Sequence, residues 1–329
     1  MVPPGTVTRV ALDPGLAAIL QLVDAMGLGE LATGTPEEGR RGFRAMTCDI
    51  RVPELVIPVG DVEDGSLPGP VGPIPYRVYR PAAPAGASRP TILFIHGGGW
   101  VIGDLDTHDN QARRLCRDVD AVVMSIDYRL APEAPFPAAV EDCWAALNWA
   151  GRHIDQLGGD AARFAVAGDS AGGNLSAVMA QLARDKGGPT LAAQLLIYPA
   201  IVFHTDYPSR TENARGYLLT LADMQWFADH YVGSLGDGID LADPRLSPIT
   251  ADLAGLAPAV VVTAEFDPLR DEGEAYARAL EDAGTPVTLV RFDGMIHGYF
   301  DLGPVSPAVE AAAARTCALL KDLLHSGPR

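Results

Sequence analysis

The sequence predicts an α/β fold in which helices flank a mostly parallel central sheet on both faces. Short apolar runs rich in valine and isoleucine alternate along the chain with longer segments whose apolar residues recur at helical spacing. The short runs are apolar throughout rather than at every second position, which is typical of strands buried on both faces. A strand, a helix and another strand in succession favour parallel pairing, because the crossover helix packs back onto the sheet.

Six apolar runs are predicted to be the strands of this sheet, and two earlier segments are predicted to lead into it as an antiparallel pair. The pair is ELVIPVGD and IPYRVYRP, with LPGPVGP between them as turn material, since proline and glycine favour turns. The six runs are TILFIH from Thr91, AVVMSIDY from Ala121, RFAVAG from Arg163, QLLIYP from Gln194, AVVVTAEFD from Ala259 and VTLVRFDG from Val287.

Four segments between the predicted strands have apolar residues at helical spacing. They are HDNQARRLCRDV, FPAAVEDCWAALNWAGRHI, SAGGNLSAVMAQLARDK and RDEGEAYARALEDAG. Gly284 is predicted to end the last of them, because glycine readily adopts the left-handed conformation found just after helices.

Two regions do not follow the alternation of strands and helices. Residues 1–45 have an amphipathic helical pattern, and residues 201–247 form a long insertion between two strands. Structureless loops of that length are rare in compact domains, so the insertion is predicted to be helical. Its segment LADMQWFADHYV has an apolar face of Met224, Phe227 and Tyr231. The core is then expected to comprise residues 46–200 and 248–329.

The composition indicates an ordinary globular protein and argues against several partners. The chain has 329 residues, of which 48% are hydrophobic and 20% charged. Its net charge of −17 repels phosphate backbones and anionic lipid surfaces, so neither nucleic acid nor a membrane is an expected partner. No apolar run approaches the length that spans a bilayer, and the N-terminus lacks the pattern of a signal peptide.

The cysteine content predicts neither a disulfide framework nor a metal centre. No pair has C-x-x-C spacing, and no cluster of cysteine and histidine has the spacing of zinc ligands. Scattered cysteines in a chain of this length predict buried thiols in a reducing compartment, and hence a cytoplasmic location without metal or cofactor. The cysteines are Cys48, Cys116, Cys143 and Cys317.

The stretch GDSAGG places a serine between glycines where a predicted strand turns into a predicted helix. Gly168, Ser170 and Gly172 occupy the fixed positions of the pattern G-x-S-x-G, the nucleophile elbow. A tight turn of this kind leaves room only for glycine-sized neighbours and exposes the hydroxyl above the sheet edge. The alternative is a glycine-rich helix start with a serine cap, but the flanking strand and helix favour the nucleophile.

A serine hydroxyl needs a base to accept its proton, and His297 is the predicted base. His297 follows the last predicted strand, whereas the other histidines apart from His96 lie in predicted helices, in the insertion or in the tail. Asp267 ends the preceding strand and is predicted to orient the imidazole. Its alternatives are a helix cap or a partner of Arg270, with Asp271 and Glu272 as rival acids. The order serine, aspartate, histidine is that of hydrolases with this elbow.

The glycine run in FIHGGGW is predicted to form an oxyanion site. Gly97, Gly98 and Gly99 lack a Cβ, so their backbone can approach a substrate carbonyl and direct N–H groups at it. Ala171, the residue after the serine, is predicted to supply another N–H, and His96 to steady the loop. A phosphate-binding loop is the competing interpretation, but the chain contains no G-x-x-x-x-G-K-[ST] pattern.

Taken together, these motifs resemble the hormone-sensitive lipase family of bacterial carboxylesterases, also called family IV. The resemblance runs from Tyr76 to the C-terminus and is carried by HGGGW, VIGDLDTHD, YRLAPEAPFPAA, GDSAGGNL, LSP, AEFDPLRDEG and GMIHGYF. It implies an α/β-hydrolase core with a helical cap, built from residues 1–45 and 201–247.

The resemblance also implies an activity and assigns roles to residues. The expected enzyme hydrolyses short- to medium-chain carboxylic esters, so a small-molecule ester is the expected partner. Homodimers through the edge strand near Val287 are implied as well. The roles that the resemblance carries over are the nucleophile for Ser170, the acid for Asp267, the base for His297 and oxyanion donors for Gly98, Gly99 and Ala171.

Two other functions fit the same sequence. The same triad could cleave amides or lactones, and nothing in the sequence excludes either bond. A non-catalytic receptor on the same scaffold is a further alternative, because plant gibberellin receptors resemble the family but lack the catalytic histidine, which is present here as His297. Six aromatic residues are candidates for pocket walls, although each fits the core as well: Trp100, Phe203, Tyr217, Trp226, Phe227 and Tyr231.

Overall fold

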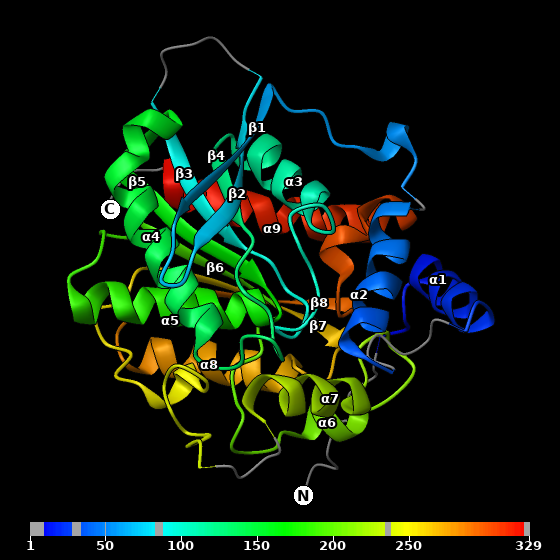
Figure 1. The fold of residues 1–329 in the computed structure, drawn as a ribbon. Coiled ribbons are helices and arrows are strands. Elements are labelled where there is room, and N and C mark those ends of the chain that lie inside the picture. The colour runs from blue at the N-terminus through cyan, green and yellow to red at the C-terminus, as the bar shows by residue number, and fades with distance from the viewer. Residues whose placement is uncertain (1–9, 28–33, 50, 83–87, 234–237, 326–329) are drawn as a thin grey trace, which may run out of the picture.

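The computed structural model describes residues 10–27, 34–49, 51–82, 88–233 and 238–325. Within these residues, eight strands form one sheet that lies between helices (Figure 1). The strands are β1 (Asp61–Pro68), β2 (Pro73–Arg80), β3 (Arg89–Ile95), β4 (Val122–Ile126), β5 (Gly159–Asp169), β6 (Ala193–Ile197), β7 (Ala259–Phe266) and β8 (Val287–Ile296).

The order of strands across the sheet confirms the predicted, mostly parallel architecture. The order is β1-β2-β4-β3-β5-β6-β7-β8. β1 and β2 pair antiparallel, β2 joins β4 antiparallel, and the strands from β4 to β8 are parallel to one another. The six apolar runs therefore form the parallel part of the sheet.

The first strand lies later in the chain than the sequence pattern predicts. The apolar stretch of ELVIPVGD suggested a strand there, but residues 53–55 form a short 3-10 turn, η2, and β1 follows at Asp61–Pro68. β1 is an edge strand, and most of its residues are exposed, so it needs little apolar content; Leu67 is its buried residue. The turn at residues 69–72 fixes the pairing of Leu67 with Ile74.

Two groups of helices cover the two faces of the sheet (Figure 1). Successive residues of a strand point to opposite faces, so Leu93 and Ile95 pack against one group while Ile92 and Phe94 pack against the other. The first group is α4 (Ala138–Leu157), α5 (Ala171–Lys186) and α8 (Arg270–Asp282). The second group is α3 (Asp109–Val119) and α9 (Pro307–His325), of which α9 lies beyond the predicted helices.

The additional helices lie beside the carboxyl edge of the parallel strands (Figure 1). The N-terminal region supplies α1 (Pro14–Ala25), α2 (Pro36–Arg44) and a π-helical turn, η1 (Ala45–Asp49). The insertion supplies α6 (Pro208–Glu212) and α7 (Leu221–Val232). Parts of both predicted regions, residues 1–9, 28–33 and 234–237, lie outside the described residues.

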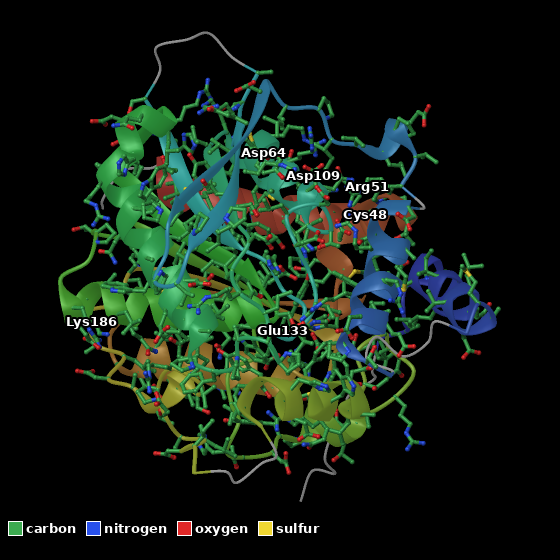
Figure 2. The ribbon with its side chains drawn as sticks, viewed as in Figure 1. Cys48, Arg51, Asp64, Asp109, Glu133 and Lys186 are labelled. Carbon is green, nitrogen blue, oxygen red and sulfur yellow. The ribbon has the colours of Figure 1, made fainter. Side chains whose placement is uncertain are left out.

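Charged side chains attach α2 to the core. The Arg40 guanidinium donates to both carboxylate oxygens of Glu133, each at 2.7 Å, and Figure 2 labels that glutamate. Arg40 also donates to the carbonyl oxygens of Val101 and Ala131, both at 2.9 Å. Because Val101 directly follows the glycine loop, α2 is fixed against that loop.

The cysteines, the helices and the metal-ligating side chains bear on three of the predictions. Cys116, Cys143 and Cys317 are buried free thiols, but Cys48 is only half-buried because it lies in η1 on the outer segment (Figure 2), so the prediction of a buried thiol is wrong there. In the part of the chain that the structure describes, no helix has the length and apolar character to cross a membrane. The same residues contain no group of three or more metal-ligating side chains.

Candidate active site

Ser170 occupies a strained turn between β5 and α5. Its φ is 55° and its ψ is −118°, a conformation that side-chain-bearing residues rarely adopt. A Cβ on Gly168 would strike the carbonyl oxygen of Gly172, and one on Gly172 would strike that of Ile95. The Ser170 N–H donates to the carbonyl of Ile197 on the neighbouring strand at 2.9 Å. The glycines of G-x-S-x-G are therefore required because the turn folds closely on itself and lies against the end of β3.

His297 and Asp267 lie within hydrogen-bonding distance of one another and of Ser170. His297 Nε2 is 3.1 Å from Ser170 Oγ, and His297 Nδ1 is 2.7 Å from Asp267 Oδ2. Since a carboxylate only accepts hydrogen bonds, Nδ1–H donates to Asp267 and Nε2 can accept the serine proton. β7 ends one residue before Asp267 and β8 one residue before His297. The carboxyl ends of β5, β7 and β8 thus bring the three side chains together.

Neighbouring groups hold Asp267 in place and form hydrogen bonds with the two alternative acids, Asp271 and Glu272. Asp267 is completely buried, and its Oδ1 accepts the N–H of Leu269 at 2.8 Å. Asp271 instead accepts from Ser209 and Arg270. Glu272 accepts from the N–H groups of Ile201 and Val202 and from Arg210. Neither rival acid contacts the imidazole.

The glycine loop after β3 presents backbone N–H groups beside the serine. Gly98 and Gly99 have φ values of 109° and 57°, and a Cβ on them would strike the Ile102 carbonyl and the Phe227 ring, respectively. Among the described residues, neither glycine N–H donates a hydrogen bond. Ala171 is the first residue of α5, so its N–H has no acceptor within the helix. This arrangement can bind a negatively charged oxygen.

Buried side chains hold the glycine loop from behind. Gly97 N–H donates to Asp169 Oδ1 at 2.9 Å, and His96 Nδ1 lies 2.7 Å from the Gly97 carbonyl oxygen. The His96 ring stacks on Tyr128, whose hydroxyl donates to the His96 carbonyl. Burial lowers the pKa of His96 to about 4, so the ring is neutral at neutral pH. The His96 ring contacts the Gly97 carbonyl and Tyr128, so it packs behind the loop.

The sequence analysis assigned no role to two buried residues beside Ser170. Asp169 is the variable residue of G-x-S-x-G, and His108 belongs to VIGDLDTHD at the start of a predicted helix. In the structure His108 Nε2 lies 3.7 Å from Asp169 Oδ2, and both residues line the cavity at Ser170. Burial opposes protonation of His108, but the Asp169 carboxylate outweighs it and raises the His108 pKa. Asp169 and His108 each occur in a motif that the sequence analysis quoted, and those motifs could have indicated that the two residues lie at the site.

The remaining histidines lie away from the serine, as the sequence predicted. Each has a ring nitrogen within hydrogen-bonding distance of a backbone carbonyl or a hydroxyl. Their partners are Trp149 for His153, Ser247 for His204, Trp226 for His230 and Val119 for His325.

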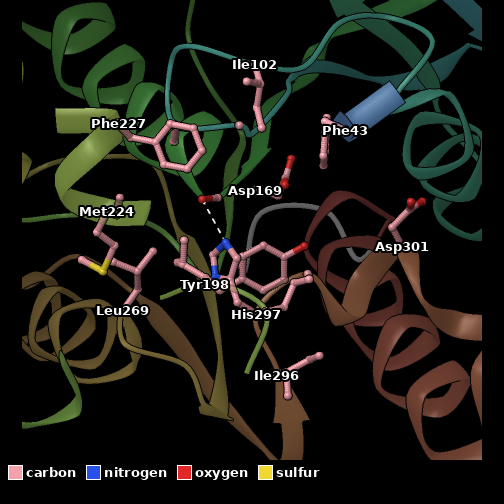
Figure 3. A pocket seen from close by; sticks show the side chains of 18 of the residues that line it. Phe43, Ile102, Asp169, Tyr198, Met224, Phe227, Leu269, Ile296, His297 and Asp301 are labelled. Carbon is pink, nitrogen blue, oxygen red and sulfur yellow. Dashed lines mark hydrogen bonds between the residues drawn. The ribbon is translucent and has the colours of Figure 1, made fainter. Parts of the chain in front are cut away.

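A cavity of about 410 Å³ opens above Ser170, and its walls come from the core, from α1 and α2, and from α7. Figure 3 shows Phe43 of α2 and Met224 and Phe227 of α7 among the lining residues. Of the six aromatic candidates, Trp100, Phe203 and Phe227 line it. The other three lie behind the walls. Tyr231 stacks on Trp100 with ring centroids 4.5 Å apart, Tyr217 packs on Phe266, and Trp226 packs on His230.

Comparisons with known sequences agree with this architecture and name a reaction class. The family model that matches residues 92–301 is described as alpha/beta hydrolase fold. The chain is 49% identical over 301 residues to carboxylic ester hydrolase LipN of Mycobacterium tuberculosis, a match that covers 88% of this chain and 77% of that protein. It is 44% identical over 328 residues to carboxylesterase NlhH of the same organism, with 98% and 99% covered.

More distant relatives and solved structures carry similar names. Ethyl acetate hydrolase of Pseudomonas putida is 38% identical over 313 residues, covering 90% of this chain and 94% of that protein. The structure of a hyperthermophilic esterase from the archaeon Pyrobaculum calidifontis matches with a TM-score of 0.89 and 42% identity, over 95% of this chain and 99% of that one.

Proposed function

The chain belongs to the α/β-hydrolase fold family and is a carboxylic-ester hydrolase, and we propose that it hydrolyses short- to medium-chain esters through an acyl-enzyme on Ser170. The family match confirms the resemblance to bacterial carboxylesterases that the motifs indicated. The observation that carries the proposal is the chain of hydrogen bonds from Ser170 through His297 to Asp267, with lengths of 3.1 and 2.7 Å.

In the proposed first step, Ser170 Oγ attacks the ester carbonyl while His297 Nε2 accepts its proton. The imidazolium that forms lies beside the Asp267 carboxylate, which stabilises it and fixes the ring orientation. His297 then protonates the departing alkoxide, and the acyl group remains on Ser170 as an ester. In the second step, water gives its proton to His297 and attacks the acyl-enzyme, which releases the acid and restores the serine.

The negative charge that develops on the carbonyl oxygen is proposed to bind to three backbone N–H groups. These belong to Gly98, Gly99 and Ala171, with Gly97 and His96 keeping the loop in place. Preorganised donors of this kind stabilise the transition state more than the ground state, because the full charge appears only there.

The helices at the carboxyl edge are proposed to form a cap, with residues 1–45 and 201–247 as its two parts and 46–200 with 248–329 as the core. α1, α2 and α7 supply apolar walls of the cavity, which supports esters of limited chain length. The names of relatives, which include carboxylesterase, esterase and ethyl acetate hydrolase, agree with such substrates.

A homodimer through β8 is proposed as well. β8 is the last strand in the sheet order, and among the described residues it pairs with β7 alone. An edge of this kind offers unpaired backbone groups to a second copy. Light scattering coupled to gel filtration measures the mass in solution. A monomer at micromolar concentration would contradict the proposed dimer but would not bear on the proposed ester hydrolysis.

Titration with an organophosphate tests the catalytic proposal directly. One equivalent of diethyl p-nitrophenyl phosphate is expected to abolish hydrolysis of p-nitrophenyl butyrate, and peptide mass spectrometry is expected to find the phosphoryl group on Ser170. An unmodified Ser170 in an inactivated enzyme would contradict the assignment of the nucleophile. Failure to hydrolyse any ester in a panel of acyl lengths would favour a receptor, and faster cleavage of matched amides or lactones would favour those bonds.

A further inference from the structure

The cavity has two arms of different chemistry on either side of the hydrogen bond between Ser170 and His297. Figure 3 shows Met224, Phe227 and Leu269 on one side of this bond. We call this side the apolar arm.

The other side of the bond carries polar groups beside the ring of Phe43 (Figure 3). Asp169, the Tyr198 hydroxyl and Asp301 lie there in the same view, and all of them line the cavity. Gln111 lines it too, and its helix, α3, packs against the 3-10 turn η4 (Tyr299–Asp301) that carries Asp301. We call this side the polar arm.

Two buried groups in the polar arm lack hydrogen-bond partners among the described residues. The Tyr198 hydroxyl and Gln111 Oε1 are both fully buried atoms, on residues that are 1% and 5% exposed. Buried polar atoms in folded proteins nearly always have a partner, because leaving one unpaired is costly. Burial, together with the Asp169 and Asp301 carboxylates, raises the pKa of Tyr198 well above its ordinary value, so the phenol stays protonated.

Asp301 is the third open group of the polar arm. Its carboxylate accepts no hydrogen bond from the described residues, whereas Asp169 already accepts the Gly97 N–H and faces His108. Burial raises the pKa of Asp301, although the positive charges of His108, Arg51 and Arg114 act in the opposite direction. Asp301 therefore has free acceptor capacity beside the cavity.

We propose that the polar arm binds a hydrogen-bond-donating group of the substrate, either a hydroxyl or an ammonium. The preferred ester would then be apolar at one end and polar at the other, with the scissile bond between the two arms. The inference rests on the proposed function, because it places the reacting carbonyl at Ser170.

The chemistry of the arm favours a donor over an anion. The Asp301 carboxylate and Gln111 Oε1 accept hydrogen bonds, and the Tyr198 hydroxyl can accept or donate. His108 faces Asp169, but the Asp301 carboxylate has no ion-pair partner within 4 Å among the described residues, so an anionic substituent would meet an uncompensated carboxylate. A site built to pair with a hydroxyl discriminates strongly against a methyl group of the same size, since its own polar atoms stay unpaired.

Pairs of esters that differ only in their terminal group test the inference. Methyl 6-hydroxyhexanoate is compared with methyl heptanoate for the acyl side, and 4-hydroxybutyl acetate with pentyl acetate for the alcohol side. Methyl 6-aminohexanoate, which is an ammonium at neutral pH, tests the charged form. The pH-stat measures kcat/KM for each. We expect the hydroxylated ester of one pair to react at least as fast as its methyl-terminated counterpart, and the pair in which this occurs identifies the part of the ester that enters the arm.

Variants of the polar arm then change this ratio. The double variant Gln111→Met with Tyr198→Phe keeps side-chain size and is expected to shift the hydroxyl-to-methyl ratio about tenfold toward the methyl-terminated ester. Asp301→Asn still accepts a hydrogen bond, so it is expected to lower the rate with the ammonium ester about tenfold and to change the hydroxyl ratio little. Asp155→Asn, at an exposed position of α4 outside the cavity, is the matched control and should leave both ratios as in the wild type.

The outcomes separate this inference from the proposed function. If wild-type enzyme hydrolyses neither methyl heptanoate nor pentyl acetate, the proposed function is wrong. A second outcome is that the enzyme hydrolyses both esters, but kcat/KM is more than tenfold higher for the methyl-terminated ester of each pair and is lowered by the ammonium group. In that case the polar arm does not bind a donor of the substrate, and the inference is overturned. An unchanged ratio in the double variant, with methyl heptanoate still hydrolysed, overturns it as well.

Discussion

The sheet edge and the helices that cover it differ in how their functional residues are specified. At the edge, Ser170, Asp267 and His297 each follow a strand directly, within a short motif. The cavity walls above them combine side chains from α1, α2 and α7 with loops of the core, so neighbours in the cavity are distant in sequence. The proposed reacting groups can therefore be recognised from short local motifs, whereas the composition of the cavity walls depends on the packing of segments that are distant in sequence.

The largest expected effect is at the sheet edge. Ser170→Ala removes the attacking oxygen and is expected to lower kcat for p-nitrophenyl butyrate at least about a thousandfold, with unchanged stability. His297→Ala should cost a comparable factor, and the double variant little more, because the two act as one unit. Ser66→Ala, on the exposed edge of β1, is the control. If the fold reductions in kcat of the two single variants multiplied in the double variant, Ser170 and His297 would not act in the same chemical step.

The next effect concerns how the insertion is attached to the core. Arg210, on α6, donates to the completely buried Glu272 at 2.7 Å. Arg210→Met leaves that carboxylate without its counter-ion and is expected to lower the free energy of unfolding by about 3 kcal/mol, measured by urea denaturation. Arg152→Met, at an exposed position of α4, is the control.

The decrease in the free energy of unfolding caused by Arg210→Met should depend on pH. Burial raises the pKa of Glu272 and Arg210 lowers it, so removing the arginine raises the pKa further. A carboxyl whose pKa is raised by folding binds its proton more tightly in the native state, and stability then falls as pH rises. The destabilisation should be larger at about pH 8 than at about pH 5. A loss that is greater in acid would contradict this account of the pair.

The glycine loop, which is proposed to bind the oxyanion, lies where the sheet edge meets the covering helices. A Cβ at Gly99 would strike the ring of Phe227 on α7, and the residue has a φ of 57°. Gly99→Ala is therefore expected to displace the N–H donor and lower kcat about a hundredfold, with a smaller change in KM. Gly42→Ala, in α2 with open space around it, should leave kcat unchanged. Equal kinetics in the two variants would argue against a donor at Gly99.

The smallest expected effect is at the attachment of α2. Arg40 is partly exposed and joins Glu133, Val101 and Ala131. Arg40→Met is expected to lower the free energy of unfolding by only about 1 kcal/mol but to broaden the range of acyl lengths accepted, because α2 lines the cavity. The measurement is kcat/KM across p-nitrophenyl esters, and an unchanged profile would show that α2 does not define the cavity length.

The sequence predicted the structure correctly where a short motif lies at the end of an apolar run that forms a strand. The parallel strands, the turn at Ser170 and the glycine loop follow from apolar runs interrupted by glycine. β1 was placed wrongly because an exposed edge strand needs few apolar residues. The cytoplasmic location stays a prediction.

The polar arm shows the limit of reading residues one at a time. Gln111 is a helical residue among other polar ones, and Asp301 follows His297 by four positions, so neither has a motif of its own. They line one cavity only because α3 packs against the turn η4. Their shared environment therefore depends on tertiary packing, which no local spacing encodes.

The most direct test of the central claim is to trap the intermediate during turnover. Wild-type enzyme is mixed with p-nitrophenyl butyrate, quenched in acid within the first turnovers and digested for peptide mass spectrometry. A butyryl group is expected on the peptide that contains Ser170, with a burst of p-nitrophenol of equal amount. A butyryl group on another residue, or a burst with Ser170 unmodified, would contradict the claim that three strand ends assemble the nucleophile, its base and its acid.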